Sequence, residues 1–181
     1  MIDIEHFRKK ELIAIILLAL SWTAANLIFR NSFYISMALA FTTMSLLLLM
    51  TCRLGRATLS LTIGVIISML LMQSGLLNIE WLLLPALIAS SIIFEIAVML
   101  TSKTRIKSIS LTLVIPALIS SAILPWTLLF TSGATTIGKL STEMINMTLA
   151  SLLSALAGTV IALLIWELIK TKKFALRIMH E

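Results

Sequence analysis

The sequence predicts an all-α integral membrane protein in which six transmembrane helices form a single domain. Of the 181 residues, 60% are hydrophobic and 12% are charged, whereas soluble domains contain about 45–50% apolar and about 25% charged residues. The apolar residues gather in six long runs, and a helix needs about 20 such residues to cross the hydrocarbon core of a bilayer. These runs and their connections use nearly the whole chain, so we expect residues 1–181 to form one membrane domain without a separate soluble part.

Each apolar run is continuous, which favours helices over the strands of a membrane β-barrel, since such strands alternate over about 10 residues. The first run extends to Phe29 without a small-x-small cleavage site, which predicts a membrane helix and not a signal peptide. The predicted spans are 11–29, 33–52, 57–76, 80–100, 108–130 and 145–169.

The positive charges predict how these spans are oriented. Arg30 and Lys139 stand alone in connections on one side, and all other Lys and Arg residues fall on the opposite side. Cytoplasmic loops carry such an excess, so we expect both termini in the cytoplasm of a multi-pass protein of the cell membrane. We also expect the basic tail to rest on anionic lipid headgroups, so that the net charge of +6 indicates membrane lipid and not nucleic acid. The residues on the basic side are Arg8, Lys9, Lys10, Arg53, Arg56, Lys103, Arg105, Lys107, Lys170, Lys172, Lys173 and Arg177.

Residues that could carry catalysis are scarce. Residues 133–140 resemble a phosphate-binding P-loop, but Leu140 replaces the Ser or Thr that would hold Mg²⁺, and no strand precedes them. The two histidines, His6 and His180, lie near the chain ends, and the single cysteine, Cys52, cannot form an internal disulfide. We therefore expect no enzyme activity, no cofactor and no metal site.

Glu95 is the acid that lies well inside an apolar run. Burying a carboxylate at membrane depth costs about 3 kcal/mol on insertion scales, so a partner is expected. Near the cytoplasmic end of its span, Glu95 is predicted to pair with Lys103, Arg105 or a basic residue of another helix. A docking contact with a partner subunit and direct substrate binding are the alternatives.

Polar and aromatic residues gather on the predicted exterior side. They either anchor the helices at the membrane interface or line a pocket that opens outward. Pro116 and Pro125 predict a kink or break in the span 108–130, because proline removes a backbone hydrogen bond. The outer half of that span is therefore the favoured pocket wall. The candidate substrate contacts are Glu80, Trp81, Trp126, Lys139 and Asn146.

Small residues spaced four apart predict close helix contacts. Such contacts serve either internal packing or docking to another membrane subunit. The patterns are Ser154, Gly158 and Ala162 in the last span, Gly64 and Ser68 in the third, and Ser21 and Ala25 in the first.

Three blocks of the chain carry a resemblance to a known family. They are Lys9-Lys10-Glu11-Leu12-Ile13-Ala14, Phe94-Glu95-Ile96 with the later Ile123-Leu124-Pro125-Trp126, and residues 151–162 before the basic tail. In these blocks and in its six-helix pattern, the chain resembles the S components of energy-coupling factor (ECF) transporters, in particular the Trep_Strep group. Two features depart from the family: Ser21 and Ala25 stand where a pair of alanines is common, and the last span is poor in glycine.

The resemblance implies an ECF S-component-like bundle that captures a vitamin or a related small molecule on the exterior side. Its partners would be a transmembrane coupling (T) subunit and two cytoplasmic ATPase subunits. By this analogy Trp81 and Trp126 would stack on the substrate, Asn146 would hydrogen-bond to it, and Glu80 and Lys139 would meet its charges. Ser21, Ala25 and Glu95 would contact partner subunits. The alternative is a structural or accessory subunit of a membrane complex, without a ligand of its own.

Overall fold

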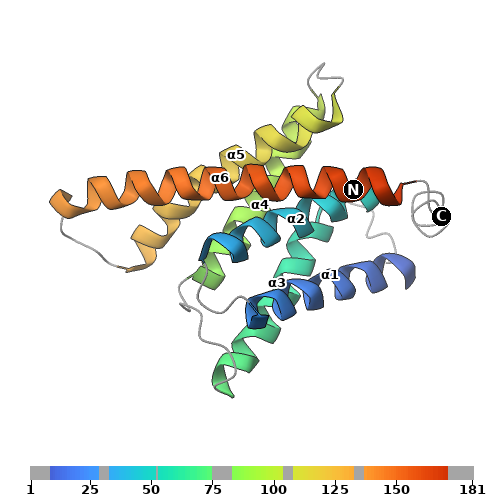
Figure 1. The fold of residues 1–181 in the computed structure, drawn as a ribbon, viewed down its shortest axis with the longest axis horizontal. Coiled ribbons are helices and arrows are strands. Elements are labelled where there is room, and N and C mark those ends of the chain that lie inside the picture. Colours follow the sequence, from blue (N-terminus) through green and yellow to red (C-terminus); the bar gives the residue numbers. More distant parts are fainter. Residues whose placement is uncertain are drawn as a thin grey trace, which may run out of the picture.

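Six helices make up the part of the chain that the computed structural model describes, which comprises residues 9–28, 33–51, 53–74, 83–103, 108–132 and 137–170. Their order along the chain is α1 (Lys9–Ile28), α2 (Phe33–Thr51), α3 (Arg56–Gln73), α4 (Leu83–Lys103), α5 (Ile109–Ser132) and α6 (Ile137–Ile169) (Figure 1). Five of these helices are long and apolar enough to cross a membrane, and α5 is apolar over Ile109–Ile123. The all-α prediction is therefore confirmed, and the chain is a multi-pass membrane protein.

Helices α5 and α6 differ from the prediction on the side of the bundle away from Glu95. The sequence indicated a loop from Thr131 to Met144, but α5 continues to Ser132 and α6 already begins at Ile137. The first turns of α6 contain several polar residues, so the hydropathy of the sequence does not mark them as part of a membrane-spanning helix. Of the predicted kink or break at the prolines, the break does not occur, because α5 is one helix through both Pro116 and Pro125.

Helix α2 is the central element of the bundle. It packs against α1, α3 and α6, and 72% of its span is buried. Gly158 of α6 allows a close approach to α2, since a Cβ atom at this position would lie 2.1 Å from the carbonyl oxygen of Ala38. The hydroxyl of Thr42 donates a 3.1 Å hydrogen bond to the carbonyl of Gly158. The small residues of α6 thus serve internal packing, and the centre of the core lies beside them, where Phe41 meets Phe94 edge to face.

Helices α1 and α3 pack side by side through another glycine. The indole of Trp22 covers Gly64, where a Cβ atom would lie 2.8 Å from Cε3 of the ring. Thr23 and Ser60 donate hydrogen bonds across this interface, to the carbonyls of Gly64 and Ile15 at 3.4 and 3.0 Å. Gly64 and Ser68 are therefore also used for internal packing.

Both prolines of α5 leave a carbonyl without its usual helical donor, four residues earlier in the chain. For Pro125 this is the carbonyl of Ser121, which accepts a 2.9 Å hydrogen bond from the hydroxyl of Ser151 on α6. For Pro116 it is the carbonyl of Thr112, which accepts a 3.5 Å bond from Thr101 on α4. The hydroxyl of Ser151 thus stabilises α5 where Pro125 interrupts its helical hydrogen bonds. The hydroxyl of Thr101 contributes less at Thr112, because it lies closer to the carbonyl of Ala97 in its own helix, at 2.9 Å.

One end of the bundle brings together the start of α1, the end of α2, the start of α3 and the end of α6 (Figure 1). We call it the basic end, because Arg53, Arg56 and Lys170 lie there. These three are the ones whose side chains the structure describes among the basic residues that the sequence predicts on one side of the membrane.

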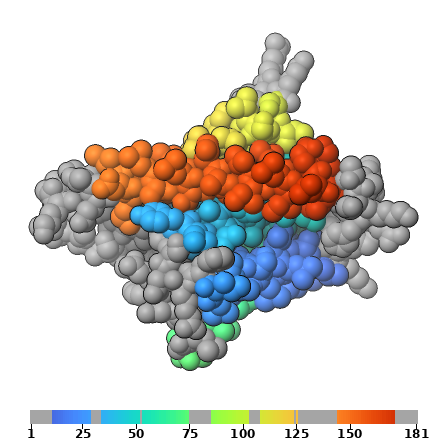
Figure 2. Space-filling model, in the orientation of Figure 1, coloured from blue at the N-terminus to red at the C-terminus, as the bar shows by residue number. Residues whose placement is uncertain are grey.

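Helices α1 and α6 lie at the surface in the view of Figure 2. Both carry exposed apolar side chains, as expected for surfaces that contact lipid. On α6 these include Ile145, Leu149, Leu153, Leu156, Val160, Leu164 and Leu168.

Candidate functional site

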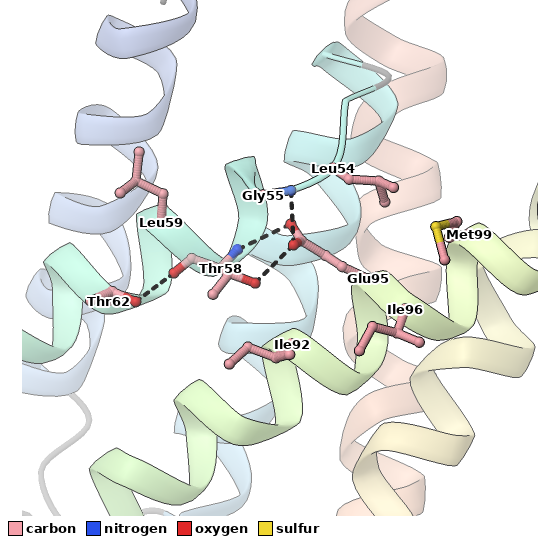
Figure 3. Close-up of a pocket in the computed structure, with 9 residues that line it drawn as sticks. All are labelled: Leu54, Gly55, Thr58, Leu59, Thr62, Ile92, Glu95, Ile96 and Met99. Carbon is pink, nitrogen blue, oxygen red and sulfur yellow. Dashed lines mark hydrogen bonds between the residues drawn. The ribbon is translucent and has the colours of Figure 1, made fainter. Parts of the chain in front are cut away.

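The carboxylate of Glu95 on α4 binds the N-terminus of α3 at the basic end (Figure 3). It accepts hydrogen bonds from the backbone N–H groups of Gly55 and Ala57, both at 2.9 Å, and from that of Thr58 at 3.2 Å. The hydroxyl of Thr58 donates a fourth bond, at 2.9 Å. Glu95 is 7% exposed, so these contacts replace most of the hydration that the carboxylate would have in water.

The local sequence explains why α3 needs this carboxylate. The first N–H groups of a helix have no acceptor within the helix, and Ser, Thr, Asp or Asn usually caps them. Here the capping position holds Gly55, which adopts a left-handed conformation with φ 84° and has no side chain to offer. The positive end of the α3 dipole in turn stabilises the negative charge of Glu95.

A second carboxylate, that of Glu11 on α1, contacts the same turn of the chain. It lies 3.2 Å from Nη2 of Arg56, the first residue of α3, and 3.6 Å from Nε of Arg53. The Glu11 side chain is 4% exposed and that of Arg56 is 11% exposed, so this is an ion pair largely shielded from solvent. The start of α3 is thus held by carboxylates from two different helices.

A groove of about 370 Å³ lies between α3 and α4 beside Glu95. Its walls are mostly apolar, and Figure 3 shows the Glu95 carboxylate directed at Gly55 and Thr58. The lining residues are Leu54, Gly55, Thr58, Leu59, Thr62, Ile92, Glu95, Ile96 and Met99. The described side chains therefore place a hollow at the basic end, where α3 begins and α4 approaches its end.

The structure locates the predicted substrate contacts only in part. Glu80 and Trp81 lie outside the described residues. Trp126 is on α5 and Lys139 is in the first turn of α6, but their side chains are not among those described. Asn146 is exposed on α6. The predicted exterior pocket therefore stays a prediction.

Of the predicted docking residues, Ser21 and Ala25 lie on the outer side of α1. Ser21 is exposed and its hydroxyl donates to the carbonyl of Leu18 in its own helix, at 2.9 Å. Ala25 is half-buried. Glu95, the third of these residues, is engaged by α3, whereas the side chains of its predicted partners Lys103 and Arg105 lie outside the described part, as does Cys52.

Three helices each carry a buried polar atom for which the described residues offer no hydrogen-bond partner: the amide Nδ2 of Asn26 and the hydroxyls of Ser36 and Ser68. The backbone of Ser36 is engaged, since the Nε1–H of Trp22 donates to its carbonyl at 3.2 Å. Asn26 itself lies in the last turns of α1 and is 6% exposed.

Comparison of the chain with protein-family models, with curated proteins and with solved structures finds no match.

Proposed function

We propose that this chain is a membrane-embedded substrate-capture subunit of a small-molecule uptake transporter of the ECF type. In this proposal it binds a vitamin or related micronutrient on the exterior side. A separate coupling subunit and two ATPases would drive the transport. The chain itself carries no ATP-binding motif in its sequence, which suits a subunit that leaves ATP hydrolysis to its partners.

The observation that carries the proposal is the outer face of α1, which the other described helices leave exposed. This helix packs against α2 and α3, and its other side exposes Ile13, Leu17, Leu20 and Ser21. An exposed small residue such as Ser21 lets the backbone of a second membrane helix come close. A coupling subunit could dock there without any change in the internal packing of the bundle.

Co-purification of the tagged protein from its native host tests this function. We expect a transmembrane coupling subunit, two ATPases and a stoichiometric small molecule, all identified by mass spectrometry. A Ser21→Trp variant should lose the coupling subunit but keep the small molecule, because its bulk blocks only the α1 face. An Ala157→Trp variant is the matched control, since Ala157 is exposed on α6, and it should keep both.

The second candidate function is an accessory subunit of a membrane complex, without a ligand of its own. It is favoured by the position of the described groove, which lies at the basic end and not at the end where a captured substrate would enter. Recovery of unrelated membrane partners and no small molecule in the same experiment would replace the transporter proposal with this one.

A further inference from the structure

Two uncharged polar side chains, one on α1 and one on α3, are buried and have no hydrogen-bond partner among the described residues. They are the amide Nδ2 of Asn26, a residue that is 6% exposed, and the hydroxyl of Ser68, which is 0% exposed. Buried polar side chains nearly always have a partner, either from the protein or from ordered water. Lipid supplies no hydrogen bond, so a partner is all the more necessary inside a membrane protein.

Contacts nearer the basic end set the register of α1 against α3. The hydroxyl of Ser60 donates to the carbonyl of Ile15 at 3.0 Å. Four residues further along each helix, a Cβ atom at Gly64 would lie 3.5 Å from the carbonyl oxygen of Ala19. The residue numbers rise together on both sides of the interface, so the two helices run in the same direction.

One more turn in this register leads to Asn26 and Ser68. Residues four apart lie on the same face of a helix, so Ser68 continues the face of Gly64 that packs against α1. The hydroxyl of Thr23 already reaches the carbonyl of Gly64, at 3.4 Å, and Asn26 lies in the turn that follows Thr23. The register therefore places Ser68 opposite the turn of α1 that runs from Thr23 to Asn26.

The hydroxyl of Ser68 is not satisfied within its own helix. The hydroxyls of Thr62 and Ser74 on α3 donate to the carbonyls of Thr58 and Leu71, at 2.8 Å each. Ser68 makes no such bond, and it makes no direct bond to Asn26 either. Polar groups that face each other without bonding directly are commonly bridged by water.

We infer that a buried water molecule joins the amide of Asn26 to the hydroxyl of Ser68 and thereby links α1 to α3. Its oxygen would accept a hydrogen bond from Nδ2 of Asn26, and Ser68 can either donate to the water or accept from it. The N–H groups of the amide disfavour a cation at this point, and neither side chain carries a charge that would hold an anion. The inference does not depend on whether the chain captures a substrate.

A crystal structure of the unaltered protein, at a resolution that shows ordered water, tests the inference directly. We expect one water peak within about 2.7–3.2 Å of both Nδ2 of Asn26 and Oγ of Ser68. A direct bond between the two side chains, or a site without a water peak, would overturn it.

Ser68→Ala gives a second test, because the bridged and the unpartnered hydroxyl predict different results. If the hydroxyl binds the water, its removal should lower the midpoint of thermal unfolding by about 2–4 °C. A buried hydroxyl without a partner would give the opposite result, since its removal leaves stability unchanged or raises it. An unchanged or raised midpoint would therefore contradict the bridge.

The same substitution in the Asn26→Leu background shows whether the two residues act through one water. Leucine has a similar size but offers no polar atom, so Ser68→Ala should then lower the midpoint much less. Ser60→Ala is the matched control, because Ser60 is buried on the same face of α3 and bonds Ile15 directly. Its effect should be equal in both backgrounds, whereas an equal effect of Ser68→Ala in both backgrounds would exclude a shared water.

Discussion

The hydroxyl of Ser151 on α6 donates a 2.9 Å hydrogen bond to the carbonyl of Ser121 on α5, the group that Pro125 leaves without a helical donor. The single proton of this hydroxyl is shared with the carbonyl of Thr148 in its own helix, also at 2.9 Å. One hydroxyl thus joins two helices at a point where α5 would otherwise expose a backbone acceptor to a medium without water.

Replacing Ser151 by alanine should lower the free energy of unfolding by about 1–2 kcal/mol, because the carbonyl of Ser121 then stays buried without a partner. Thermal unfolding of the purified protein in detergent measures the change. Ser102→Ala is the control, since Ser102 is exposed and its hydroxyl bonds the carbonyl of Met99 in its own helix, and it should change stability by less than about 0.5 kcal/mol. Equal effects of the two variants would show that the contact between α5 and α6 contributes nothing.

Glu95→Gln should cost about 2–3 kcal/mol of stability, although it preserves the size of the side chain. The amide cannot accept with its nitrogen, so at least one N–H among Gly55, Ala57 and Thr58 loses its acceptor and meets a donor instead. Hydrogen exchange of the first turn of α3 should accelerate in this variant.

Glu167→Gln is the control for that experiment. Glu167 is 62% exposed and pairs with Lys170 in the same helix, and exposed ion pairs of this kind contribute about 0–1 kcal/mol. Unchanged exchange at Gly55–Thr58 in Glu95→Gln would contradict the capping role.

The ion pair between Glu11 and Arg56 can be tested by a double-mutant cycle. Glu11→Gln alone should cost about 3 kcal/mol, because it leaves the charge of a shielded guanidinium without its carboxylate. The double variant with Arg56→Gln should be more stable than the sum of the two single effects predicts. The same cycle on Glu167 and Lys170 should give a coupling free energy near zero. Similar coupling free energies for the two pairs would contradict the claim that burial strengthens the pair between Glu11 and Arg56.

Gly158→Ala tests the contact between α2 and α6. Alanine has the higher helix propensity by about 1 kcal/mol, so a stability gain would follow if the site had room. The added methyl group would lie 2.1 Å from the carbonyl oxygen of Ala38, so α2 and α6 would have to move apart. The packing energy lost in this movement exceeds the gain in helix propensity. We expect a net loss of about 2 kcal/mol in thermal unfolding. Ala157→Leu adds more atoms at an exposed position of the same helix and should be nearly neutral.

Much of the helix arrangement could be predicted because hydropathy is a strong signal. The predicted spans 11–29 and 33–52 agree closely with Lys9–Ile28 and Phe33–Thr51. The start of α6 was predicted eight residues too late, since its first turns contain polar residues such as Ser141 and Thr142. A hydropathy pattern detects the part of a helix that lies in lipid and is silent about the part that extends beyond it.

For Glu95, the sequence predicted that the carboxylate has a partner but not which groups supply it. A buried acid requires a partner, and a basic side chain is the partner that a sequence suggests first. The partners in the structure are backbone N–H groups, which every residue carries and which leave no mark in a sequence. One signal was available: Arg53-Leu54-Gly55-Arg56 offers no side chain that could cap the helix after it, and a helix without a local cap needs one from elsewhere in the chain.

Glu11 was noted only as part of a resemblance, and its contact with Arg56 was missed. The two residues are far apart in the chain, and nothing in the sequence sets the register between α1 and α3. That register follows from the fit of Trp22 on Gly64, where the indole ring packs directly on the backbone of a residue that has no side chain. Such pairings depend on shape in three dimensions and are not visible in periodicity.

The cap on α3 also has a consequence for the order in which the protein is made. Gly55 and its acceptor Glu95 are separated by 40 residues, so the ribosome has produced the whole of α3 and most of α4 before the cap can form. Until then the first turn of α3 must keep its N–H groups in contact with water or headgroups. The N-terminal turn of α3 can therefore reach its final hydrogen bonding only after Glu95 of α4 has been made.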